Sequence, residues 1–132
     1  MSVPKLRSFV LDSRDVRRAA EFYRELLGLT YRPGDEQPRP GEDWLVLVSG
    51  DGSWRLAFQQ SDNLRATTWP DGEVPQQMHL DTVVDDVEEL DRQHERVLSL
   101  GGELRLDRRD DPEEPLRVYA DPDGHLFCIF VG

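Results

Sequence analysis

The chain has 132 residues, a length that fits one domain or two small halves sharing a core. Its 27 acidic and 16 basic residues give a formal net charge of −11, which disfavours nucleic acid and anionic membranes as partners. We find no apolar run near the ~20 residues of a membrane span and expect no signal peptide. The single cysteine excludes an intrachain disulfide. We therefore expect a cytoplasmic protein.

One pattern occurs twice in the chain. Residues 8–16 have a counterpart in residues 79–87, at an offset of 71 positions. Each copy is typical of a short strand that runs into an acidic helix start. Asp15 and Asp86 are natural N-caps, because a carboxylate there accepts hydrogen bonds from the free amides of the first helical turn. The chain is thus predicted to contain two related modules.

An apolar stripe at helical spacing follows each cap. In the first module it covers residues 16–27, and Gly28 ends the helix. In the second module it covers residues 87–98, and Gly101-Gly102 ends it. The Glu and Arg residues between the apolar positions are expected to face solvent.

Three strand candidates follow each helix, so the predicted order is βαβββ, twice. The modules span residues 1–60 and 77–132 and are joined by a polar, proline-containing linker at 61–76. The candidate strands are Leu29–Arg32, Trp44–Ser49, Trp54–Gln60, Glu103–Leu106, Leu116–Ala120 and Leu126–Val131.

These residues resemble the vicinal oxygen chelate superfamily of glyoxalases, bleomycin-resistance proteins, fosfomycin-resistance enzymes and extradiol dioxygenases. The resemblance covers nearly the whole chain and implies an α+β fold. In that fold, tandem βαβββ modules with curved mixed sheets enclose a cavity, commonly in a homodimer. The residues that carry the resemblance are Asp15-Val16-x-x-Ala19-Ala20-x-Phe22-Tyr23-x-x-Leu26-Leu27-Gly28-Leu29, His79-Leu80-Asp81 and Asp121-Pro122-Asp123-Gly124-His125.

The family's enzymes hold a divalent metal at four positions, which map by position onto Ser8, Ala57, His79 and Cys128. Alanine has no ligand atom, and a neutral serine hydroxyl is a poor donor for a divalent ion. Two ligands remain where the enzymes use three or four. We therefore predict that no metal cofactor is bound.

A rebuilt site is the alternative, because strand alternation places Asp81 on the same face as His79. His79, Asp81 and Cys128 would then hold one divalent metal with an open position. The simpler interpretation makes His79 a cavity-wall imidazole and Cys128 a small buried hydrophobe.

A cavity without a metal suits a moderately polar organic ligand. Aromatic side chains are expected to stack on a planar ligand, and His79, Asp81 and Gln59 to orient it. The negative net charge favours cationic ligands. Side chains predicted to line the cavity are Ser8, Val10, Tyr31, Trp44, Ala57, Gln59, Trp69, His79, Asp81, Cys128 and Phe130.

The resulting hypothesis is metal-independent binding of a small aromatic molecule, similar to family members that confer antibiotic resistance by sequestration. The ligand would occupy two symmetric pockets of a homodimer. The competing hypothesis is an enzyme, a lyase, isomerase or dioxygenase of the glyoxalase type. It would use either a metal or His79 as a general base oriented by Asp81.

Overall fold

The structure is a computed structural model and describes residues 2–132. The chain forms two compact units; the first ends at Leu64 and the second comprises Arg65–Gly132. Each unit contains one complete βαβββ module, as the repeat predicts. No helix in the described part of the chain is long and apolar enough to cross a membrane.

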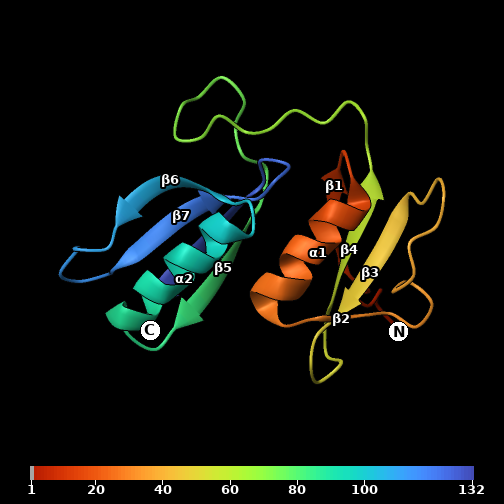
Figure 1. The fold of residues 1–132 in the computed structure, drawn as a ribbon, viewed down its shortest axis with the longest axis horizontal. Coiled ribbons are helices and arrows are strands. Elements are labelled where there is room, and N and C mark those ends of the chain that lie inside the picture. The colour runs from red at the N-terminus through yellow and green to blue at the C-terminus, as the bar shows by residue number, and fades with distance from the viewer. Residues whose placement is uncertain (1) are drawn as a thin grey trace. The chain divides into compact units, whose positions relative to one another are not determined.

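The first unit is a four-stranded sheet with one helix on it, in the strand order β1-β4-β3-β2 (Figure 1). Strands β1 and β4 are parallel, and the other neighbours are antiparallel. Its elements are β1 (Phe9–Ser13), α1 (Val16–Leu27), β2 (Thr30–Tyr31), β3 (Trp44–Val48) and β4 (Arg55–Gln60).

Helix α1 packs on one face of this sheet, so the sheet has a helix-covered face and an opposite face. Asp15 caps the helix by accepting from the Arg18 amide, and Gly28 ends it in the left-handed conformation with φ 66°. The buried Tyr23 ring stacks on Phe58 of β4, with centroids 5.8 Å apart. Alternation along β4 therefore turns the neighbouring Ala57 and Gln59 side chains away from the helix.

The second unit repeats this architecture with the strand order β5-β8-β7-β6. The Asp86 side chain caps α2 by accepting from the Glu89 amide. The buried Tyr119 and Phe127 rings stack with centroids 5.4 Å apart. Its elements are β5 (His79–Val84), α2 (Val87–Ser99), β6 (Glu103–Arg108), β7 (Leu116–Ala120) and β8 (Leu126–Val131).

The predicted strand at 29–32 is shorter than expected, because β2 contains only Thr30 and Tyr31. The Leu29 amide donates to the Arg24 carbonyl and so belongs to the helix end, and Pro33 cannot donate to a neighbouring strand. In the second unit β6 runs two residues past the predicted end at Leu106 and reaches Arg108.

Much of the predicted linker packs within the second unit. The Nη1 atom of Arg105 donates to the carbonyls of Thr67 and Trp69, both at 2.9 Å. The Trp69 ring packs against a buried cluster of β7 and β8 that includes Cys128. Residues 65–76 therefore form a strap across the second sheet.

Candidate functional site

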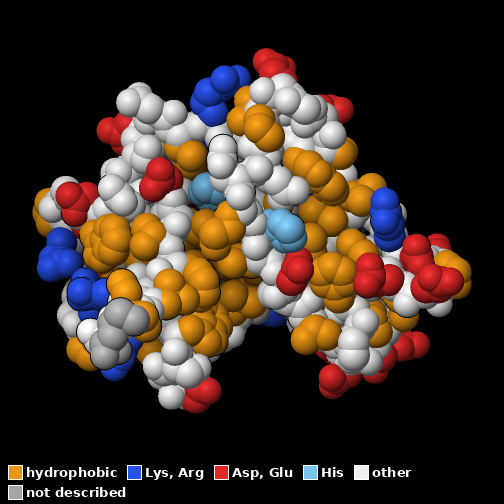
Figure 2. All heavy atoms as spheres, turned by 180° about the vertical axis from the view of Figure 1, so that it is seen from behind, with side chains coloured by type: hydrophobic (Ala, Val, Ile, Leu, Met, Phe, Trp, Pro, Cys, Tyr) orange, Lys and Arg blue, Asp and Glu red, His pale blue; other side chains and the backbone are white. Residues whose placement is uncertain are grey.

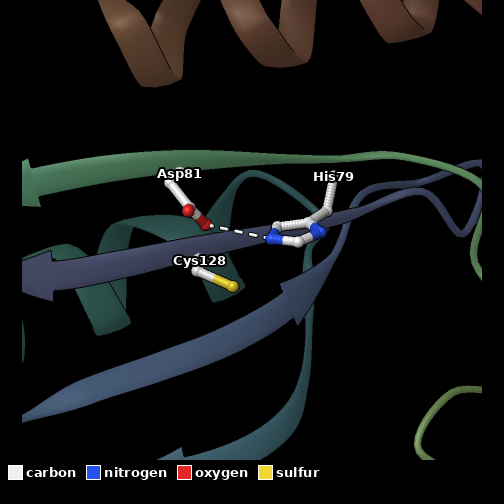
Figure 3. A group of neighbouring side chains, drawn as sticks. All are labelled: His79, Asp81 and Cys128. Carbon is white, nitrogen blue, oxygen red and sulfur yellow. Dashed lines mark ion pairs between the residues drawn. The ribbon is translucent and has the colours of Figure 1, made fainter.

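His79, Asp81 and Cys128 come together on one face of the second sheet (Figure 3). In the register of the parallel strands β5 and β8, His79 pairs with Leu126 and Asp81 pairs with Cys128. Residues two apart on β5 point to the same side, and the pairing brings Cys128 beside them. The grouping predicted from alternation is confirmed.

The three ligand atoms of this cluster lie within 4.8 Å of one another. The His79 Nε2 and Asp81 Oδ1 atoms are 3.2 Å apart, and the two side chains are 41% and 57% exposed. Cys128 is 8% exposed. A solvent-facing imidazole and carboxylate thus stand over a covered thiol.

Burial raises the pKa of the Cys128 thiol to about 11, and the negative charge of Asp81, together with its hydrogen bond to the thiol, adds to this effect. Near pH 7 the thiol is therefore protonated. A protonated, covered thiol is a poor nucleophile, so the geometry agrees with the interpretation of Cys128 as a small buried residue.

The donor set has the chemistry of a metal site, since imidazole, carboxylate and thiolate all bind divalent ions. The cluster fits an ion only if the three atoms close in and the thiol loses its proton, because metal ligands bind deprotonated. The other two family positions, Ser8 and the fully buried Ala57, belong to the first unit and offer a hydroxyl and a methyl group. The second unit alone would have to hold the metal.

The first sheet carries a pocket of about 390 Å³ on the face away from α1. Val46 of the lining pairs with Ala57, whose side chain points away from the helix, so the pocket lies on that face of the sheet. Figure 2, which views the molecule from behind, shows basic side chains beside hydrophobic ones on this unit, at the left. The lining residues are Arg7, Ser8, Arg32, Trp44, Val46 and Arg55.

Four predicted ligand-binding residues stand on or beside this pocket. Ser8 and Trp44 line it, and Trp44 is 36% exposed. Val10 is 40% exposed and pairs with Ala57, while Gln59 pairs with Trp44. Alternation therefore places the predicted side chains of β1, β3 and β4 on one face, with Ala57 buried among them.

Tyr31 lies apart from that pocket, on the side of α1. Its hydroxyl donates to Glu21 Oε2 at 2.6 Å, and the Arg17 guanidinium lies 5.0 Å from its ring centre. Burial and the bond to Glu21 raise the pKa of Tyr31 to about 12. A ligand role for Tyr31 stays a prediction, and these contacts give it a packing role.

Trp69 and Phe130 both pack on the Cys128 side of the second sheet. Phe130 pairs with Val83, which is 65% exposed. Trp69 is half-buried there and packs against the buried cluster, and a ligand role for it stays a prediction. The cysteine cluster therefore has an aromatic border.

The sequence analysis did not single out the arginines of the first pocket. Arg55 alternates with Ala57 and Gln59 on β4, and this spacing already assigns it to the same face. Arg7 precedes β1 and Arg32 follows β2. Because both lie outside the strands, strand alternation does not predict which way their side chains point.

With this geometry established, the family can be assigned. The family model of the glyoxalase-like domain matches residues 8–130. The chain belongs to this family, and the fold is that of glyoxalases and bleomycin-resistance proteins. A search of the curated proteins gives no significant match.

Solved structures with the same fold include several resistance proteins. The fosfomycin resistance protein FosX from Mesorhizobium loti is 21% identical, with a TM-score of 0.69 over 99% of this chain and 94% of that one. A FosX mutant from Listeria monocytogenes, complexed with Mn(II) and a dihydroxypropylphosphonic acid, is 19% identical, with a TM-score of 0.71 over the same shares. A glyoxalase/bleomycin resistance protein/dioxygenase family enzyme from Burkholderia phytofirmans is 17% identical, with a TM-score of 0.69 over 94% and 95%. At these identities the likeness shows the fold alone.

Proposed function

We propose that this protein binds a small aromatic organic molecule at the pocket of the first sheet and needs no metal to do so. The observation that carries the proposal is Trp44, a partly exposed indole in the wall of a pocket of about 390 Å³. Pockets of this size hold small organic ligands, and an indole offers a flat apolar surface for stacking.

The donor chemistry of this pocket also supports the proposal. Among the described residues, those that line it include no histidine, cysteine or carboxylate. Its oxygen donor Ser8 and its three arginines suit hydrogen bonding to an organic ligand and are poor ligands for a divalent ion.

The direct test is Trp44→Ala, measured by the ligand-induced shift in melting temperature across a set of planar aromatic compounds. We expect the shift to disappear, because the stacking surface is gone. Trp54→Ala is the matched control, since Trp54 is similarly exposed, at 39%, and lies outside the pocket lining. Equal shifts in both variants would refute the stacking model.

The biological role that fits such binding is sequestration of an antibiotic as self-resistance, carried out by a homodimer with two pockets. Expression in a sensitive bacterium is expected to raise tolerance to the bound compound, and Trp44→Ala is expected to remove that tolerance.

The second candidate is an enzyme of the glyoxalase type, favoured by the convergence of His79, Asp81 and Cys128 within 4.8 Å. A divalent ion held by these residues would supply Lewis-acid chemistry. Without an ion, His79 beside Asp81 at 3.2 Å has the geometry of an oriented general base.

Metal analysis of untagged protein, before and after incubation with Zn, Ni, Mn and Fe(II), separates the two candidates. One tightly held ion per chain, lost in His79→Ala and kept in His94→Ala, would favour the enzyme. His94 is a suitable control because its Nδ1 atom already contacts the Tyr119 hydroxyl at 2.8 Å.

A further inference from the structure

The charged side chains that line the first pocket all have the same sign. They are Arg7, Arg32 and Arg55, and among the described residues no carboxylate lines the pocket. The chain as a whole carries 27 acidic residues against 16 basic ones. The pocket is therefore a local basic site in an acidic protein. It favours an anionic ligand, whereas the net charge of the chain predicts a cationic one.

Arg32 is held in place from behind by a buried carboxylate. Its Nη2 atom lies 3.0 Å from Asp35 Oδ2, and Asp35 is 3% exposed. The same Oδ2 accepts from the Val46 amide at 3.0 Å. Asp35 thus compensates the Arg32 guanidinium and fixes its direction, and it also lies 3.6 Å from Arg39 Nη2, outside the pocket lining. The Val46 amide ties this carboxylate to a residue that lines the pocket.

Arg7 and Arg55 remain without such compensation. In residues 2–132, neither guanidinium has an ion-pair partner. Arg55 is half-buried on β4 and lines the pocket beside Arg7. Gathering uncompensated like charges in one hollow costs free energy, and a bound anion would recover it.

We propose that the ligand of this pocket is an aromatic carboxylate, with its ring on Trp44 and its carboxylate between Arg55 and Arg7. The assignment rests on the proposed function, since it names the chemical class of that ligand. A guanidinium donates two parallel hydrogen bonds to a carboxylate, and the indole beside it supplies the stacking surface. The Ser8 hydroxyl, also in the lining, is a further donor.

Calorimetric titration with three naphthalene probes tests the charge preference. The probes are 2-naphthoate, 2-naphthalenemethanol and 2-naphthylmethylamine, which share the ring and differ in charge. We expect 2-naphthoate to bind at least about 10-fold more tightly than the alcohol, because one charge-assisted hydrogen bond contributes about this much affinity. The amine is expected to bind most weakly. The advantage of the acid is expected to shrink as NaCl is raised.

Two arginine variants locate the effect. Arg55→Gln is expected to weaken 2-naphthoate about 10-fold and to leave the alcohol unchanged, because only the acid uses the guanidinium. Arg65→Gln removes the same charge from an exposed position in the other unit and is expected to change neither probe.

The outcomes separate this inference from the proposed function. Equal binding of the three probes, still lost in Trp44→Ala, would overturn the carboxylate preference and leave aromatic binding intact. Loss of 2-naphthoate affinity in Arg65→Gln as large as in Arg55→Gln would also overturn it, because the effect would then reflect net charge. Absence of binding by every probe would overturn the carboxylate assignment, and the proposed function would then depend on the melting-temperature screen.

Discussion

Cys128 shows how one neighbouring side chain sets the chemistry of another. The thiol is 8% exposed, and burial is the largest cause of its raised pKa, followed by the charge and the hydrogen bond of Asp81. The same carboxylate lies 3.2 Å from His79. Asp81 thus suppresses the reactivity of the thiol while it orients the imidazole.

This arrangement predicts a pH profile for alkylation of Cys128, the single cysteine. With the thiol pKa at about 11, the thiolate fraction at pH 8 lies below that of a free cysteine and grows as pH approaches 11. Iodoacetamide is therefore expected to react slowly at pH 8 and faster at each step upward. Rapid modification at pH 8 would contradict this account.

Asp81→Asn separates the two causes of the raised pKa. Loss of the carboxylate charge removes one of the contributions that oppose ionisation of the thiol, so the thiol pKa falls and alkylation at pH 9.5 becomes faster. Asp85→Asn, an exposed carboxylate beyond the end of β5, is the matched control. An unchanged rate in Asp81→Asn would leave burial as the sole cause.

At the scale of elements, the turn between β7 and β8 holds the strap of the second unit. Gly124 in this turn has φ 89°, and a Cβ placed there would lie 2.2 Å from the Ala66 Cβ. Glycine is required twice over, once for the backbone conformation and once for the close approach. The strap and the turn are thus packed against each other without room for a methyl group.

Substitution of Gly124 by alanine is expected to lower the free energy of unfolding by about 3 kcal/mol, from overpacking added to backbone strain. Gly52→Ala is the matched control, because Gly52 has φ 75° and an added Cβ there would meet no atom within 4 Å. It should cost about 1 kcal/mol, the strain alone. Urea unfolding measures both, and equal losses would show that the strap does not pack tightly at Ala66.

A large part of the fold is predictable from the sequence, because the same pattern occurs twice. An element predicted in one module supports the corresponding element in the other. The caps at Asp15 and Asp86, the helix lengths and the strands β7 and β8 follow from local patterns and agree with the structure. The cysteine cluster follows from strand alternation and pairing at β5 and β8.

The arginine pocket is less accessible to this reasoning. The Arg32 side chain is oriented by Asp35, a buried carboxylate in the irregular segment after β2. An irregular segment has no repeating pattern from which the direction of a side chain can be predicted. Arg7 lies outside regular structure as well. The net charge of −11 even favours a cationic ligand, whereas the arginines of the pocket favour an anionic one. The charge of the whole chain does not predict the charge of a single pocket.

At the scale of the whole molecule, the exposed apolar side chains support the proposed homodimer. Several large ones stand on strands or beside them: Phe9, Val10, Trp44, Trp54, Val83 and Leu104. Light scattering coupled to gel filtration is expected to give twice the chain mass of 15.2 kDa. A monomer at micromolar concentration would remove the dimer from the proposal and leave each pocket to act alone.

The most direct test of metal-independent binding is calorimetric titration of 2-naphthoate into chelator-treated protein and into protein loaded with Mn(II). The account predicts the same dissociation constant in both, lost in Trp44→Ala and kept in His79→Ala. Binding that requires Mn(II) and disappears in His79→Ala would contradict it and transfer function to the His79, Asp81 and Cys128 cluster.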